Sequence, residues 1–310
     1  MPGIHLSSER MGFVTSRTQA WLLGLYERTC ADATPPRSSI FQILVGCWIC
    51  EKALAEDTEE SNVWPLARGI QKYLDRQEDL STFLNDDAAL VLLSAGILRA
   101  FDCSSSAIES FVQDISQISS TFKDNVSTET LALYHSRLLL HNLGSHPKPM
   151  TPSIDLSQIR SEKDLFRADE SLIRSLATDI AASTAYGRDA FAPEPELLEQ
   201  LATVIPVWML CYLRQHNLEM GTLLLRTMNY LHLQDIAFST ALNFVLMQQQ
   251  PDGRFGFLGP EASQLRSTKP QFNEEFDLYL PITVSCLWAI AESTNPDFIL
   301  FNSIGEGAIL

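Results

Sequence analysis

The segment with the clearest chemical potential spans residues 272–281 and reads FNEEFDLYLP. It places Glu275 and Asp277 beside the aromatic residues Phe276 and Tyr279, just before an apolar run with helical periodicity. A carboxyl group among aromatic rings can act as an acid or stabilise a cation. We therefore predict Glu275 or Asp277 as general acid or base and Tyr279 as a hydrogen-bond donor. In the alternative interpretation, the acids form a solvated loop whose charges favour a helix N-terminus.

Other chemical signatures are incomplete. The sequence has no G-x-S-x-G, no P-loop and no G-x-G-x-x-G, which argues against standard hydrolases, NTPases and dehydrogenases. A Cys-x-x-Cys pattern at Cys47 and Cys50 falls inside an apolar helical run with no preceding strand. We therefore expect buried, reduced thiols as the default for all six cysteines, which are Cys30, Cys47, Cys50, Cys103, Cys211 and Cys286.

Helical periodicity dominates the chain, and no strand-turn-strand pattern is convincing. Apolar residues recur at helical spacing over residues 16–30, 38–56, 64–76, 86–101, 104–122, 128–143, 168–186, 195–215, 219–232, 234–249 and 281–293. A linker rich in Pro, Ser and Gly at residues 144–164 is the one candidate boundary. The mostly short connections imply antiparallel neighbours, so we predict a single all-α domain over residues 1–310.

The composition indicates a globular protein with an acidic surface. Of the 310 residues, 45% are hydrophobic, and the net charge is −16. This charge repels phosphate backbones and argues against nucleic-acid binding. The apolar runs are broken before the roughly 20 residues that a membrane span needs, and the first residues do not look like a secretory signal. We therefore expect a cytoplasmic protein without a membrane span.

A particular corner follows the apolar run at residues 234–249. Residues 248–261 read QQQPDGRFGFLGPE and lead into a long polar loop. Asp252 and Gly253 favour a turn in which the glycine takes a positive φ. Gln248 or Gln249 can hydrogen-bond the exposed peptide groups of that turn. The corner is thus expected to fix one helix pair against the next.

This corner, followed by a helix at PITVSCLWAIAE, resembles the Q-x-x-D-G-x-[FW]-G element of α/α toroids. That family includes terpenoid cyclases and protein prenyltransferase β-subunits, and the resemblance is strongest over residues 231–292. It implies antiparallel helical hairpins forming an α/α toroid, with Phe255 and Phe257 inserted between neighbouring hairpins. An open helical repeat or a bundle is the alternative architecture.

The resemblance also implies a central cavity, which opens where the N-terminal loops of the inner helices gather. The acids of residues 272–281 would then lie at its mouth. We predict Trp208, Trp288 and Phe255 as cavity lining. Asp179 is a further catalytic candidate, and Tyr186 is a further lining candidate on the segment TDIAASTAYG.

The catalytic motifs of the family are incomplete here. Class II terpenoid cyclases use D-x-D-D, whereas LNDD at residues 84–87 lacks the first acid, and Asp86 and Asp87 also suit a helix start. The metal-binding D-D-x-x-D motif lacks its last acid. Prenyltransferase β-subunits hold zinc with an acid and a cysteine two residues later, but Cys286 lies nine residues after Asp277. We therefore expect no metal and no cofactor.

These observations favour a biosynthetic enzyme that binds a largely apolar small molecule in a central cavity and catalyses acid-assisted cyclisation or group transfer. A non-catalytic helical scaffold or partner-binding subunit is the first alternative, because it explains the incomplete motifs. A glycan-processing toroid is the second, and it needs two carboxylates flanking an open aromatic cleft. A protein partner or a homo-oligomer is compatible with each hypothesis.

Overall fold

The computed structural model describes residues 8–31, 37–54, 63–76, 80, 88–121, 131–145, 167–189, 195–268, 272–295 and 297–300. Within these residues the regular elements are helices, which confirms the predicted all-α class. The strand-like pairing in this part of the chain is limited to an isolated antiparallel bridge between Gln249 and Phe255. Asp86, Asp87 and most of the predicted linker at residues 144–164 lie outside the described residues.

The helices of the N-terminal half are α1 (Ser8–Ala31), α2 (Arg37–Ile49), the π-helix η1 (Cys50–Leu54), α3 (Val63–Leu74), α4 (Ala88–Ala100), α5 (Ser106–Thr121) and α6 (Leu131–Asn142). Those that follow are α8 (Glu170–Ser183), α9 (Pro195–Arg214), α10 (Leu218–Tyr230), α11 (Ile236–Met247), α12 (Gly259–Thr268), the π-helix η3 (Glu275–Tyr279) and α13 (Leu280–Thr294). Most lie within a few residues of the predicted ranges, although α1 begins at Ser8 rather than at residue 16.

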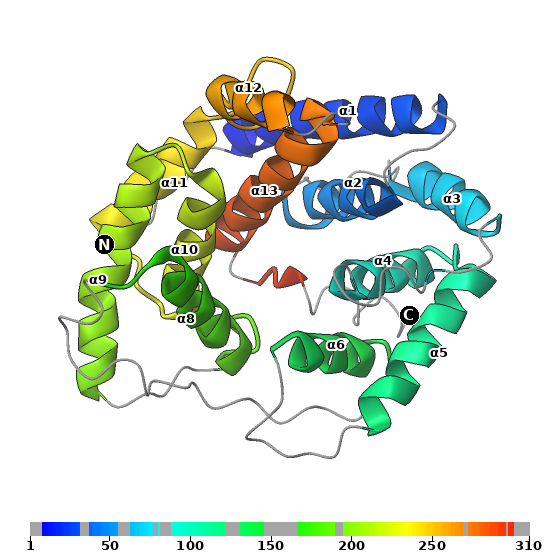
Figure 1. Ribbon diagram of the computed structural model, residues 1–310, viewed down its shortest axis with the longest axis horizontal. Coiled ribbons are helices and arrows are strands. Elements are labelled where there is room, and N and C mark those ends of the chain that lie inside the picture. The colour runs from blue at the N-terminus through cyan, green and yellow to red at the C-terminus, as the bar shows by residue number, and fades with distance from the viewer. Residues whose placement is uncertain are drawn as a thin grey trace.

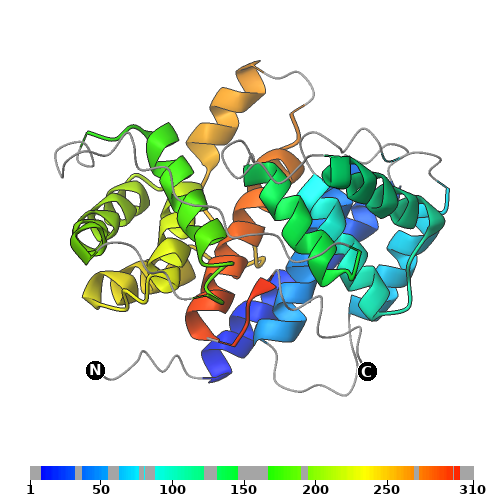
Figure 2. The same cartoon turned by 90° about the horizontal axis from the view of Figure 1, so that it is seen from below.

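Six of the described helices contact one another in succession around the molecule (Figure 1). Helix α2 packs against α4, α4 against α6, α6 against α8, α8 against α10, and α10 against α13, which packs back against α2. Helices α1, α3, α5, α9 and α11 pack on members of this series. Figure 2 shows α13 between the helices of residues 37–142 and those of residues 170–247.

Burial along each helix follows from its neighbours. Helix α4 contacts α2, α3, α5 and α6 and is buried at every position from Val91 to Leu98. Helix α3 has fewer neighbours and buries a single stripe at the i, i+3, i+4, i+7 spacing of an amphipathic helix, made of Val63, Leu66, Ala67, Ile70 and Leu74. The apolar pattern of each helix therefore indicates how many of its faces are covered by other helices.

The corner after α11 ties the chain back to its first helix. Gln249 Nε2 donates hydrogen bonds to Val14 O at 2.8 Å and to Thr18 Oγ1 at 2.9 Å, both on α1. Thr18 Oγ1 in turn donates to Gly253 O at 2.7 Å. Gly253 has a φ of +103°, and a Cβ at this position would lie 2.1 Å from Arg17 O. Only glycine fits this close approach.

The same corner also contacts α13, because Phe255 N donates to Thr283 Oγ1 at 3.1 Å. Phe255 is fully buried as predicted, but the prediction for Phe257 was wrong, since its side chain is 60% exposed. The side chain that binds a peptide group of the turn is that of Gln250, which donates to Gly256 O. The side chains of Gln248 and Gln249, which were predicted in this role, donate to Phe244 O and to α1 instead.

The polar loop expected after the corner contains a helix, α12 (Gly259–Thr268). Its sequence GPEASQLRST has Glu261 in the first turn and Arg266 in the last, both favourable to the helix dipole. Periodicity missed it because it buries only Ala262 and so has no apolar stripe.

One described helix, Glu196–Arg214, is long and apolar enough to cross a membrane by composition alone. It contains Pro206 and packs against α10 and α11. Long apolar helices inside a helical fold meet the same criterion, so this feature is weak support for a span, and no clear membrane span follows from it.

Candidate functional site

The two acids predicted as catalytic lie on the π-helix η3. Glu275 Oε1 accepts a hydrogen bond at 3.0 Å from Nη2 of Arg28 on α1, in an ion pair whose side chains are 53% (Arg28) and 36% (Glu275) exposed. Asp277 is exposed, and its Oδ2 accepts from Asn273 N at 2.7 Å. These positions fit the alternative interpretation, in which the acids are solvated and stabilise a helix start.

The third residue of this group, Tyr279, is buried. Its hydroxyl accepts a hydrogen bond from Leu258 N at 3.3 Å, and the guanidinium of Arg254 lies 4.1 Å from its ring centroid. The predicted lining residues Phe255 and Trp208 are also buried, the latter on α9. All three side chains belong to the hydrophobic core.

Two other predicted residues do come together. Tyr186, just after α8, stacks on Trp288 of α13 with ring centroids 6.4 Å apart and an interplanar angle of 27°. Asp179 is half-buried on α8. About 13 Å of helix separates Trp288 from Tyr279 at the usual rise per residue. The acids of η3 therefore lie before the first turn of α13, whereas this aromatic pair lies near the middle of that helix.

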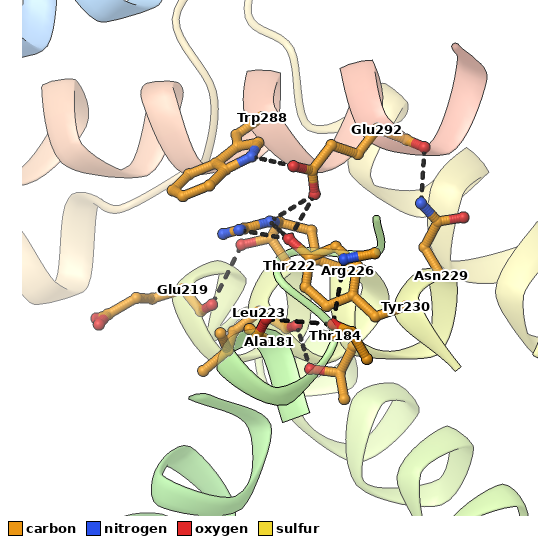
Figure 3. Close-up of polar contacts among 12 residues, drawn as sticks. Ala181, Thr184, Glu219, Thr222, Leu223, Arg226, Asn229, Tyr230, Trp288 and Glu292 are labelled. Carbon is orange, nitrogen blue, oxygen red and sulfur yellow. Dashed lines mark hydrogen bonds and ion pairs between the residues drawn. The ribbon is translucent and has the colours of Figure 1, made fainter. Parts of the chain in front are cut away.

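A buried polar cluster adjoins the aromatic pair (Figure 3). Glu292 Oε2 accepts hydrogen bonds from Arg226 Nε at 3.0 Å and from the hydroxyl of Tyr230 at 2.7 Å. Its other oxygen, Oε1, accepts from Trp288 Nε1 at 2.6 Å. The Tyr230 hydroxyl also accepts from Arg226 Nη2 at 2.6 Å. We call these four residues the Arg226 cluster, and they join α10 to α13.

Aromatic contacts complete the cluster. The Arg226 guanidinium carbon lies 3.2 Å from the centroid of the Trp288 ring, which is a close cation–π contact. The rings of Tyr186 and Tyr230 are nearly perpendicular, at 89°, with centroids 6.2 Å apart. Because Tyr186 follows α8 and Trp288 belongs to α13, the two rings meet across α10, which packs between those helices. The face of α10 that carries Arg226 and Tyr230 is thus covered by aromatic side chains.

Burial and charge set the protonation of the cluster. Burial by itself would lower the pKa of Arg226, but Tyr230 and Glu292 outweigh this effect and raise that pKa above its usual value. Burial raises the pKa of Tyr230 well above its ordinary value, with Arg226 opposing the shift and Glu292 adding to it. The guanidinium is therefore charged and the phenol is protonated, so the phenol can donate to Glu292.

The turn after α8 brings Tyr186 to the cluster through an unusual backbone. Ala185 and Tyr186 have φ values of +45° and +59°, a region that non-glycine residues rarely occupy, and Gly187 follows at +88°. The turn is held by the hydrogen bond from Gly187 N to Thr184 Oγ1 at 3.1 Å. A Cβ at position 187 would lie 3.0 Å from Cδ1 of Tyr230. Backbone strain of this kind often accompanies functional sites.

Sequence reasoning missed Arg226, Tyr230 and Glu292, although a signal was present. Arg226 interrupts the apolar run of α10, and Glu292 is the one charged residue of α13. A charged side chain inside an apolar helix is costly to bury alone, so two such helices with opposite charges predict a pair. Tyr230 lies four residues after Arg226 and therefore on the same face of α10.

The cysteines give a mixed outcome. Cys47 and Cys50 are buried, and burial raises the pKa of Cys50 to about 12, so neither is a reactive thiolate at neutral pH. The expectation of a buried thiol was wrong for Cys211, which is exposed on α9. The side chain of Cys30 lies outside the described residues. No group of three or more metal-ligating side chains occurs in the part of the chain that the structure describes.

Comparisons of the chain with protein-family models, with curated proteins and with solved structures find no match.

Proposed function

We propose that the chain is an α/α toroid, with α2, α4, α6, α8, α10 and α13 as inner helices and α1, α3, α5, α9 and α11 on the outside. The succession of contacts from α2 to α13 and back to α2 supports this arrangement. The corner at residues 248–256 supports it as well, because it ties α11 to α1 and α13. An open helical repeat would not need a contact between α13 and α2.

Within this toroid, we propose that a largely apolar small molecule binds on the inner face, beside Trp288 and Arg226. The observation that carries the proposal is the meeting of Tyr186 and Trp288 across α10. Trp288 is half-buried and packs against the hydrophobic core. Apolar and aromatic surfaces with a few placed polar groups are typical of small-molecule sites.

The reaction that the resemblance implies for such a molecule is cyclisation or group transfer in a biosynthetic enzyme. The exposed positions of Glu275 and Asp277 offer little support for either residue as a proton donor to an apolar ligand. Tyr230 is a hydrogen-bond donor and a weak acid, since its pKa is raised. The free thiols of the described cysteines support the expected cytoplasmic location.

The test is mass spectrometry of small molecules extracted from the purified protein. We expect a retained molecule in the wild type and its loss from Trp288→Leu. Trp64→Leu is the matched control, because Trp64 also stacks with an arginine, Arg68, but lies 42% exposed on α3. The proposal fails if no molecule is retained, or if both variants keep it equally. Thermal unfolding of each variant shows that the comparison is made on folded protein.

A scaffold or partner-binding subunit is the second candidate. Large apolar side chains are exposed on α9, at Val207 and Leu210, and at the corner, at Met247 and Phe257. Exposed apolar side chains that gather on one surface are typical of protein interfaces. If Val207→Asp with Leu210→Asp changes the mass of the protein in solution, measured by light scattering, an interface on α9 is supported.

A further inference from the structure

Arg226 has more hydrogen-bond donors than the cluster uses. A guanidinium carries five N–H donors, of which one is on Nε and two are on each Nη. Nε donates to Glu292 and Tyr230, and Nη2 donates to Tyr230. Among the described residues, no hydrogen bond is formed by Nη1. The side chain is 9% exposed. Nη1 is not among the fully buried polar atoms that lack a hydrogen-bond partner, so it keeps some exposed surface that a ligand can reach.

We infer that Arg226 Nη1 binds a neutral acceptor oxygen, such as that of a ketone, ester or amide, on an otherwise apolar ligand that packs beside Trp288. This inference rests on the proposed function and names the class of its ligand. A hydrogen bond that involves a charged group contributes about 1.5–3 kcal/mol, so an acceptor placed beside Nη1 is favourable.

The charges of the cluster decide between a neutral acceptor and an anion. Arg226 and Glu292 carry one charge of each sign at 3.0 Å, and the Tyr230 phenol is neutral. A ligand carboxylate would add a second negative charge near Glu292 in a place that is poorly solvated, which is unfavourable. The chain's net charge of −16 also repels anions from a distance. A neutral oxygen satisfies Nη1 without this repulsion.

The aromatic contacts decide the character of the rest of the ligand. The guanidinium carbon lies 3.2 Å from the centroid of the Trp288 ring, so a group that reaches Nη1 also lies beside the indole (Figure 3). Tyr186 stacks on the same indole at 6.4 Å. Aromatic surroundings of this kind favour a flat apolar body with the acceptor at one edge.

The experiment compares three probes of similar size on the full chain: acetophenone with a neutral carbonyl, ethylbenzene without an acceptor, and benzoate with an anionic one. Binding is followed by the NMR signal of the Trp288 indole N–H, which is assigned by its loss in Trp288→Phe. We expect acetophenone to bind about tenfold more tightly than ethylbenzene, the size expected for a hydrogen bond to a charged group. Benzoate should bind more weakly than acetophenone.

A variant adds a second measurement. Arg226→Lys keeps the positive charge beside Glu292 but removes the Nη1 donors. We expect it to lose the preference for acetophenone over ethylbenzene, while Arg68→Lys on α3 leaves that preference unchanged. The wild-type probe series stands by itself if Arg226→Lys does not fold.

The outcomes separate this inference from the proposed function. If acetophenone and ethylbenzene bind equally tightly, as followed by the Trp288 signal, the site is supported but the neutral acceptor is overturned. Tighter binding of benzoate would replace the neutral acceptor by an anion and overturn the inference in the same way. If no probe shifts the Trp288 signal, the inference falls together with the site.

Discussion

Two ion pairs of the same length tie the segment formed by η3 and α13 to other helices. Arg226 and Glu292 join α10 to α13, and Arg28 and Glu275 join α1 to η3, each with an N–O distance of 3.0 Å. The side chains of the first pair are 9% and 2% exposed, whereas those of the second are 53% and 36% exposed. If one residue of the exposed pair is removed, water can solvate the charge that remains. Water cannot do so in the buried pair, so each of its charges needs the other for stabilisation.

The environment of each glutamate therefore decides what its side chain can do, and the sequence drew attention to only one of the two. Glu275 lies in a segment with many acids and aromatic rings, which drew attention to chemistry. Glu292 is a single charge in an apolar helix, yet its carboxylate is the one that holds three different side chains.

The largest expected effect comes from removing the buried carboxylate. Glu292→Ala should lower the free energy of unfolding by about 3–5 kcal/mol, because Arg226 is left as a buried charge without its partner. Tyr230 and Trp288 also lose their acceptor. Urea unfolding followed by circular dichroism measures the loss. Glu275→Ala is the matched control and should cost at most about 1 kcal/mol. Equal losses from the two variants would show that burial is not what separates the pairs.

The turn that brings Tyr186 to the cluster gives the next largest effect. Gly187→Ala should lower the free energy of unfolding by about 2–3 kcal/mol, since a non-glycine residue at positive φ costs about 1–2 kcal/mol before any clash. The added Cβ would then crowd Tyr230. Gly144→Ala is the control, because Gly144 has a φ of +70° with no atom within 4 Å of the added Cβ. A difference of zero between the two variants would remove Tyr230 from the explanation.

A smaller effect, with its own pH dependence, is expected for Tyr230→Phe. The loss of the hydroxyl should cost about 1–2 kcal/mol at neutral pH, as one hydrogen bond to a charged group is removed. Because the pKa of Tyr230 is raised in the folded protein, its phenol loses a proton in the unfolded chain first, near pH 10. Stability then falls as the pH rises above about 10, by up to about 1.4 kcal/mol per pH unit from this group.

Tyr230→Phe should remove the contribution of this phenol to the fall of the unfolding free energy with pH. Unfolding free energies at several values between pH 9 and pH 11 would show it, with the wild type declining more steeply than the variant. The buried cysteines lower the stability of both proteins equally as the pH rises, so they do not affect the difference between the two slopes. Parallel slopes would mean that Tyr230 titrates normally in the folded protein.

The helices were predictable because each carries its own periodic pattern, which depends on local neighbours in the sequence. Helix α12 was not, because it buries only Ala262 and packs no stripe against a neighbour. The corner was predictable as a turn at Gly253, but its hydrogen bonds to Val14 and Thr18 were not. Those bonds join residues more than 200 positions apart, and no local pattern specifies them.

The candidate site shows the same limit. Tyr186 and Trp288 were each named from their own surroundings, but their stacking depends on how α8, α10 and α13 pack. Arg226 and Glu292 are 66 positions apart, and only the fold brings them together. The exposure of Glu275 also could not be predicted from the sequence, because an acidic loop before a helix has the same sequence pattern whether it faces a cavity or the solvent.

The smallest expected effect concerns the exposed pair. A double-mutant cycle with Arg28→Ala and Glu275→Ala should give a coupling energy of about 0.2–1 kcal/mol in low salt. The coupling should fall toward zero in 1 M NaCl, where the screening length is only about 3 Å. Arg226 and Glu292 should show little dependence on salt, because ions do not enter between side chains that are almost fully buried. A coupling in the Arg28–Glu275 pair that is large and unaffected by salt would mean that η3 is shielded from solvent. Glu275 would then regain the apolar surroundings that an acid catalyst needs.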